Sequence, residues 1–148
     1  MSLEALDQQI LHLLSEQGRL SYTDLARITG LSTSAVHQRV RRLEQRGIIR
    51  GYRADIDPAA AGVPLTAFVA VMPLDPAQPD DTPERLREVG EIEACHSVAG
   101  DHSYLLKVRV AGPADLEALL ARIRALAQVS TRTTVVLSTA YEGRPPSL

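Results

Sequence analysis

The sequence is short of several residue types, and each shortage excludes a class of protein. Aromatic residues make up 3% of the 148 residues and tryptophan is absent, so any core must consist mainly of aliphatic side chains. Cys95 is the only cysteine, which excludes an internal disulfide, and we expect its thiol to be buried in a strand. No apolar run approaches the roughly 20 residues that span a membrane, and the N-terminal stretch does not resemble a signal peptide. These shortages favour a cytoplasmic protein with no membrane partner.

Positive charge is concentrated in the first third of the chain. Residues 1–53 contain eight arginines and five acidic residues, a net charge of +3, whereas residues 54–148 have a net charge of −5. Residues 32–53 alone contain six arginines and one acid. A basic patch on an otherwise acidic protein indicates a local site for a polyanion. The alternative is an ordinary solvated helix face.

Apolar residues recur at helical spacing in three successive stretches near the N-terminus. Ser21, followed by an acid three residues later, and Ser32 are predicted to cap the starts of the second and third helices. Gly18, Gly30 and Gly47 are predicted to end the three helices. Three short helices with a glycine in the tight turn before the third are typical of a helix-turn-helix unit. The segment that follows the third helix is predicted to be extended, as a wing or a strand.

The second half of the chain has a different periodicity. β-Branched and alternating stretches predict four strands, and Thr82–Pro83 and Gly112–Pro113 are predicted to start two helices, with the Thr82 hydroxyl as a cap. The predicted strands are 66–72, 92–98, 104–110 and 131–137. Their order with the helices is β-α-β-β-α-β, the ferredoxin-like arrangement. The predicted fold class is therefore α+β: a three-helix, winged helix-turn-helix head followed by a ferredoxin-like domain.

The third helix has the chemistry that a DNA-reading helix requires. Val36, Val40 and Leu43 form one apolar face that would anchor it, and the opposite face is polar near its start. Gln can bond an adenine edge, hydroxyls and His are adaptable base contacts, and arginines reach phosphates or a guanine. The predicted DNA-binding residues are Ser32, Thr33, Ser34, His37, Gln38, Arg39, Arg41, Arg42, Arg50 and Arg53.

Each of these features also has a simpler explanation. Some three-helix units are only dimerisation or scaffold modules. Ser and Thr at a helix start are often only caps, and His37 could be an ordinary surface histidine. The combination of short helices, Gly30, the polar face and the arginines favours DNA binding over these alternatives.

The segment LSTSAVHQRVRRLEQRGIIRGYRADIDPAAAG (residues 31–62) resembles the recognition helix and hinge of the leucine-responsive/AsnC (Lrp/AsnC) family of feast/famine regulators. The Leu-Ser opening, the Val-x-x-Arg-Val-x-x-Leu-Glu core and the Gly-Ile-Ile-x-Gly-Tyr exit all match. The second half is similar to the ligand-sensing (RAM) domain of that family, so the resemblance covers almost the whole chain. It implies a helix-turn-helix domain at 1–50, a hinge strand and linker at 51–64, a ligand-sensing and oligomerisation domain at 65–141, and a loose tail at 142–148.

The resemblance also implies how the protein would assemble on DNA. Members of the family bind double-stranded DNA as dimers, or as dimers assembled into octamers. A two-fold dimer would present two recognition helices to a pseudo-palindromic site, and strands of the C-terminal domain would pair across the dimer. Five residues match recognition-helix positions of the family: Ser34, His37, Gln38, Arg39 and Arg42.

The effectors of the family are usually amino acids, bound where dimers meet. The family's sensing turn is typically Gly-x-x-Asp-Tyr, and the matching residues here are Gly100, Asp101, His102, Ser103 and Tyr104. Glycine permits a tight backbone with exposed N–H groups suited to a carboxylate, and Asp101 could pair with an ammonium group. Ser103 stands where the family usually has the acid before the tyrosine. The alternative is a plain hairpin turn with Tyr104 at the edge of the core.

Two further classes of function compete with a regulator. Some two-domain proteins that resemble this family are tetrapyrrole decarboxylases, but no catalytic triad, metal-ligand spacing or phosphate-binding loop is found in this sequence. We therefore predict no catalytic residues, no metal and no cofactor. The other competitor is a purely structural protein whose head no longer binds DNA, and the retained arginines argue against it.

Overall fold

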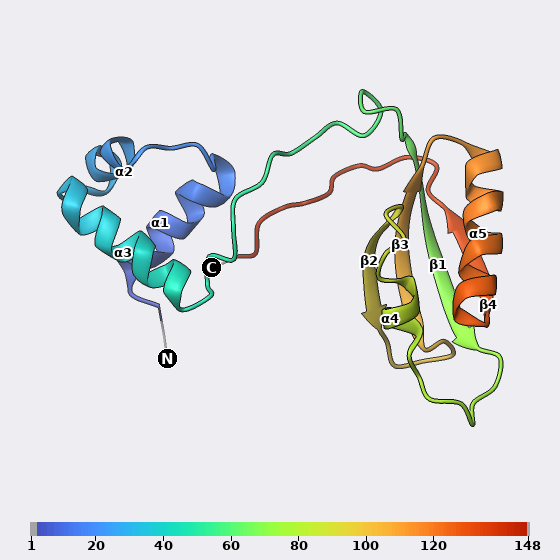
Figure 1. The fold of residues 1–148 in the computed structure, drawn as a ribbon. Helices are drawn as coiled ribbons and strands as arrows, with labels where there is room; N and C mark the ends of the chain where they lie inside the picture. Colours follow the sequence, from blue (N-terminus) through green and yellow to red (C-terminus); the bar gives the residue numbers. More distant parts are fainter. Residues whose placement is uncertain (1–2, 148) are drawn as a thin grey trace. The chain divides into compact units, whose positions relative to one another are not determined.

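The computed structural model describes residues 3–147 and divides the chain into two compact units (Figure 1). One unit contains the chain up to Asp55 together with the segment from Tyr141 onward. The other is Ile56–Ala140. The tail predicted to be loose is therefore grouped with the N-terminal unit, although residues 142–147 form no helix or strand.

The N-terminal unit is built from three helices: α1 (Ala5–Glu16), α2 (Tyr22–Thr29) and α3 (Thr33–Gln45). Their apolar faces meet in one small core, in which the largest fully buried side chains are Ile10, Leu25, Val36, Val40 and Leu43. Burial of this shared face, rather than the propensity of such short helices, stabilises them. The predicted helix-turn-helix unit is confirmed.

The ends of α2 and α3 are fixed by the residues that the sequence indicated. Ser21 and Asp24 form a capping box, in which the Ser21 hydroxyl accepts from the Asp24 N–H at 3.0 Å. Ser32 caps α3 by accepting from the Ala35 N–H at 3.2 Å. Gly30 has φ +73°, a left-handed conformation that ends α2 and that a side chain would disfavour.

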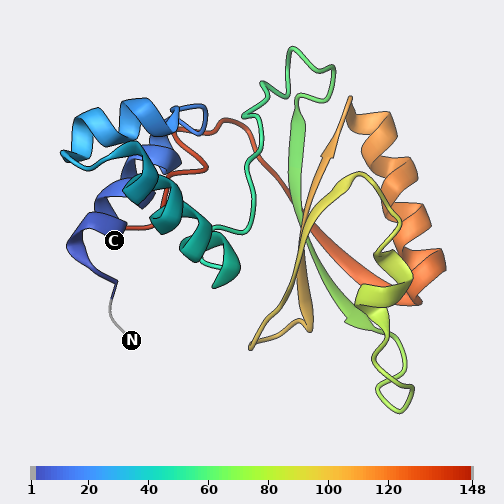
Figure 2. The same cartoon turned by 60° about the vertical axis from the view of Figure 1, so that its left-hand side comes forward.

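The C-terminal unit is a four-stranded antiparallel sheet covered on one face by two helices. Its strands are β1 (Leu65–Pro73), β2 (Ile92–Ser97), β3 (Tyr104–Val110) and β4 (Val129–Val135), in the spatial order β2-β3-β1-β4. Its helices are α4 (Thr82–Leu86) and α5 (Pro113–Ala127). Figure 2 shows both helices on the same side of the sheet. The predicted β-α-β-β-α-β fold is confirmed.

The two faces of this sheet differ in burial. On the helix face, alternate residues of the central strands, such as Val69, Leu106 and Val108, are fully buried against α4 and α5. On the other face, Phe68 and Met72 of β1 are exposed, at 37% and 40%, beside half-buried residues of β3. One face therefore forms the core, and the other leaves large apolar side chains accessible.

Three local predictions in this unit were wrong. Thr82 is not the helix cap: it is the first residue of α4 and is buried, and Asp81 precedes it without a side-chain cap bond. β4 begins at Val129, two residues earlier than predicted, because Gln128 takes a left-handed conformation (φ +53°) that reverses the chain. Cys95 is exposed rather than buried.

The hinge strand and wing predicted after α3 are not formed in this chain. Residues 51–57 have no assigned strand, and residues 58–62 form turns in which the Asp57 carbonyl accepts from the Ala61 N–H. A strand requires a hydrogen-bonded neighbour, and within the described chain residues 51–57 pair with no other strand.

Candidate nucleic-acid interface and ligand site

The outer face of α3 is accessible along its length. Because Val36, Val40 and Leu43 are fully buried, the opposite side of the helix faces away from the core. Most of the predicted DNA-binding residues are exposed on or beside this helix: Ser32, Thr33, Ser34, His37, Gln38, Arg41 and Arg42. The structure therefore exposes seven of the ten predicted residues on one short helix and its cap.

The start of α3 combines polar side chains with a helix N-terminus. The Ser32 hydroxyl caps the helix and lies 3.2 Å from the Ser34 hydroxyl. Ser32 therefore acts as a helix cap, which is the alternative explanation given above for its place at the helix start. Ser34, Gln38 and Arg41 or Arg42 follow at the spacing of one helix face. The partial positive charge of a helix N-terminus favours an anion such as phosphate. This end can thus contact both bases and backbone.

His37 is held by an aromatic neighbour that sequence reasoning missed. Its ring lies edge-on to Tyr22, with centroids 5.1 Å apart and planes at 85°. Tyr22 is the first residue of α2 and is 39% exposed. The first helix of a helix-turn-helix pair crosses the DNA backbone, so the capping box at Ser21, which marks the start of that helix, was the signal that could have identified Tyr22.

Arg39, also predicted to contact DNA, does not lie on the exposed face of α3. Its Nη1 atom lies 2.8 Å from Glu4 Oε2 and 2.8 Å from Asp7 Oδ1, and its side chain is 19% exposed. These two carboxylates raise the pKa of Arg39, so the guanidinium stays charged. Arg39 therefore joins α3 to the start of α1 instead of pointing to solvent.

Arg50 and Arg53 lie in the exposed segment that follows α3. Between them, the Tyr52 hydroxyl donates a hydrogen bond to Glu44 Oε1 at 2.9 Å. Burial, followed by the neighbouring Glu44 carboxylate, raises the pKa of Tyr52 to about 12. The phenol thus remains a donor, and the segment is attached to the last turn of α3.

The turn between β2 and β3 has the open backbone expected of a sensing turn. Gly100 has φ +148°, and Asp101 is exposed while His102 and Ser103 are half-buried. Ser103 is fixed at both backbone groups: its N–H donates to the Val71 carbonyl at 3.1 Å, and its carbonyl accepts from the Val98 N–H at 3.0 Å. Among the described residues, the N–H groups of 100–102 donate to no backbone carbonyl. They are therefore available to an anion.

Tyr104 is a buried residue at the edge of the core. It is 9% exposed, and its hydroxyl donates to Asp80 Oδ2 at 2.8 Å. The Asp80 hydrogen bond and burial raise the pKa of Tyr104 to about 12. The ring thus packs at the edge of the core, as in the alternative explanation of this turn. Its hydroxyl connects the residue that follows the turn to the loop before α4. The sequence alone does not indicate Asp80 as its partner.

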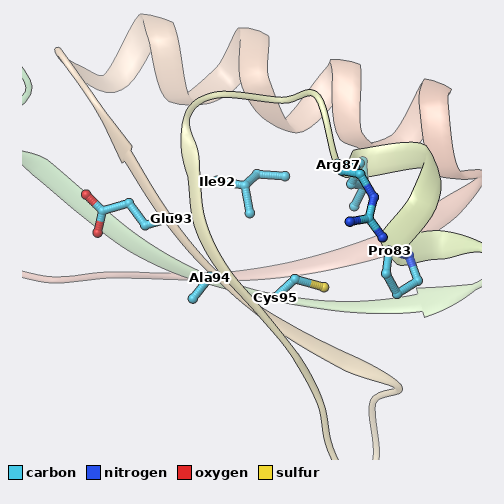
Figure 3. A pocket seen from close by; sticks show the side chains of 7 residues that line it. Pro83, Arg87, Ile92, Glu93, Ala94 and Cys95 are labelled. Carbon is cyan, nitrogen blue, oxygen red and sulfur yellow. The ribbon is translucent and has the colours of Figure 1, made fainter. Parts of the chain in front are cut away.

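A shallow pocket of about 270 Å³ lies between α4 and the edge strand β2. Figure 3 shows Cys95 and Pro83 on either side of it, with Ile92 nearby. Burial raises the pKa of Cys95, and Glu84 and Asp80 raise it further, so the thiol stays protonated. The pocket explains why a strand cysteine on the helix face of the sheet is still accessible.

No helix within residues 3–147 is both long and apolar enough to cross a membrane. No group of three or more His, Cys, Asp or Glu side chains within the same residues is placed to hold a metal ion.

Both halves of the chain match models of known domains. The AsnC-type helix-turn-helix domain matches residues 3–44, and the Lrp/AsnC ligand binding domain matches residues 66–146. The chain belongs to the Lrp/AsnC family of transcriptional regulators. As an Lrp/AsnC regulator it is a DNA-binding protein with a ligand-binding domain, and the enzyme alternative is excluded.

Similarity to other Lrp/AsnC proteins extends over nearly the full chain. The HTH-type transcriptional regulator LrpA of Mycobacterium tuberculosis is 52% identical over 143 residues, which are 97% of this chain and 95% of that protein. The leucine-responsive regulatory protein of Haemophilus influenzae is 39% identical over 141 residues, 92% of this chain and 84% of that protein. The solved structure of the feast or famine regulatory protein of M. tuberculosis complexed with L-methionine has a TM-score of 0.96 at 51% identity, covering 98% of this chain and 99% of that chain.

Proposed function

We propose that this regulator recognises a specific DNA sequence through the outer face of α3. Ser34, His37 and Gln38 contact base edges in the major groove, while Arg41, Arg42 and the arginines after the helix contact phosphates. The single observation that supports this most strongly is that Ser34, His37, Gln38, Arg41 and Arg42 are exposed on a helix whose other face is fully buried.

We propose further that the protein acts as a two-fold dimer, and that dimers assemble into octamers. The uncovered sheet face supports dimerisation, because Phe68 and Met72 would gain burial against the same face of a second subunit. Two α3 helices related by a two-fold axis suit a pseudo-palindromic site with half-sites about 34–36 Å apart.

The effector proposed for the turn at 100–104 is an amino acid. The relative from M. tuberculosis that was solved with L-methionine motivates this class of ligand. The open N–H groups of the turn suit the ligand carboxylate, and the exposed Asp101 carboxylate suits its ammonium group. Tyr104 contributes through its bond to Asp80, which fixes the strand that follows the turn.

Substitution of Gln38 and Arg42 tests the DNA interface. We expect Gln38→Ala to relax the base preference at one position, at a cost of about 1–3 kcal/mol on the preferred site. We expect Arg42→Ala to weaken binding to all sequences and to reduce the slope of log K against log salt by about 0.9. In vitro selection of duplexes, followed by fluorescence-anisotropy titrations over a range of salt, measures both.

Arg87→Ala is a suitable control for that experiment, since Arg87 is an exposed arginine directly after α4 and outside the proposed interface. It should leave base preference and salt slope as in the wild type. If the Gln38 and Arg42 variants also match the wild type in both measurements, the placement of α3 on DNA is wrong.

Ligand-dependent stability and mass test the proposals for the C-terminal domain. A ligand at a hundred times its dissociation constant stabilises the folded form by about 2.7 kcal/mol, so saturating L-methionine should raise Tm for the wild type. Asp101→Asn should reduce that shift, while Glu117→Gln on the exposed side of α5 should not. Sedimentation of the same samples should show a dimer or a multiple of it. An unchanged Tm with all twenty amino acids contradicts the effector, and a monomer at micromolar concentration contradicts the dimer.

A further inference from the structure

The chain folds back onto α3 immediately after that helix ends. The N–H groups of Ile48 and Ile49 both donate to the Leu43 carbonyl, at 2.9 and 3.2 Å. Gly51 has φ +155°, a conformation that residues with a side chain rarely adopt. This backbone path brings Tyr52 back alongside the helix.

Tyr52 is attached to α3 by a charge-assisted hydrogen bond. Its hydroxyl donates to Glu44 Oε1 at 2.9 Å, and Glu44 lies two turns along the helix from His37. A hydrogen bond to a carboxylate is stronger than one between neutral groups. Tyr52 and Glu44 therefore connect the last turn of α3 with the segment that leaves the head.

Arg50 and Arg53 flank this attachment point. Both are exposed, and no helix or strand fixes the backbone on which they lie. Arginines on a free segment would lose conformational entropy when they bind phosphate, whereas a segment already held on the helix has lost that entropy beforehand.

We propose that Tyr52 is a positioning residue for DNA binding, which fixes Arg50 and Arg53 beside the recognition helix by docking their segment on Glu44. This inference rests on the proposed DNA contacts of those two arginines. Tyr52 itself need not touch DNA.

A double-mutant cycle measures the positioning role directly. Arg50→Ala with Arg53→Ala should weaken binding about tenfold or more at 0.1 M salt and reduce the salt slope by up to about 0.9 per lost phosphate contact. Tyr52→Ala should weaken binding similarly, and adding it to the arginine pair should cause little further loss. Glu44→Ala should behave as Tyr52→Ala, and Glu44→Gln, which keeps an acceptor oxygen, should restore most of the affinity.

The controls separate positioning from a loss of folding. Tyr141→Ala removes an exposed tyrosine of the tail and should leave affinity and slope unchanged. The helical circular dichroism and Tm of each variant should match the wild type. If Tyr52→Ala does not fold, the cycle is measured with Tyr52→Phe and with Glu44→Ala and Glu44→Gln instead.

Each remaining outcome counts against the proposal in a distinct way. If the arginine double variant weakens DNA binding, but Tyr52→Ala causes its full loss of affinity in addition, the positioning role is wrong and the DNA contacts of Arg50 and Arg53 remain supported. If the arginine pair has no effect although Arg42→Ala does, the contacts assigned to Arg50 and Arg53 fail, and the positioning role fails with them.

Discussion

Arg39 shows how one residue can have the right chemistry for a site and still lie elsewhere. It is one of three arginines within four positions of α3, and from the sequence alone all three are predicted to contact DNA. Position 39 lies three residues after Val36 and four before Leu43, which places it at the margin of the buried stripe. That spacing was available in the sequence, but the acidic partners on α1 could not be inferred without the fold.

Loss of Arg39 should destabilise the head rather than act on DNA. Arg39→Ala leaves the Asp7 carboxylate, which is 4% exposed, without its cation. Breaking such a pair costs about 3–5 kcal/mol when it is deeply buried, and we expect about 2–3 kcal/mol here because Arg39 is partly exposed. Urea unfolding followed by helical circular dichroism measures it, and the exposed Arg41→Ala should stay within about 0.5 kcal/mol of the wild type.

The DNA affinity of the same variants distinguishes the two roles of arginine. Under conditions where Arg39→Ala remains folded, its salt slope should equal that of the wild type, whereas the slope for Arg41→Ala should fall. A variant at position 39 that is fully stable but shows a reduced salt slope contradicts the structural role assigned to Arg39.

Other residues at the sites could not be predicted because their partners are distant in sequence. Tyr104 was identified as part of the sensing turn, but its bond to Asp80 joins residues 24 positions apart. Tyr22 meets His37 only because the turn between α2 and α3 brings their exposed sides together. The chemistry of a single residue predicts which kind of contact it can make, but the fold determines which neighbouring residue it contacts.

At the scale of elements, local signals predicted the fold well where they act within a few residues. The caps at Ser21 and Ser32 and the left-handed Gly30 fixed the helix boundaries, and β-branched alternation located the strands. The failures have one physical origin. The strand expected after Gly51 and the early start of β4 both depend on pairing or chain reversal, which residue type alone does not encode.

At the scale of the whole molecule, the two units separate two activities. The unit with the three helices has the cluster of arginines, and the sheet unit has the acidic balance and the ligand-binding domain. A net negative protein whose basic residues cluster on and just after one helix is expected to bind DNA through that region, since the acidic remainder of its surface repels phosphate. The central claim is therefore that DNA covers the outer face of α3 and leaves the C-terminal unit accessible.

Protection of an introduced thiol tests this claim most directly. In a Cys95→Ser background, Ser34→Cys places a near-isosteric thiol at the start of α3, and Glu117→Cys places one on the exposed side of α5. Alkylation rates are measured with and without a saturating duplex obtained by selection. The account predicts that the duplex strongly slows alkylation at position 34 and leaves the rate at position 117 unchanged. Equal rates at position 34 with and without bound duplex would contradict it.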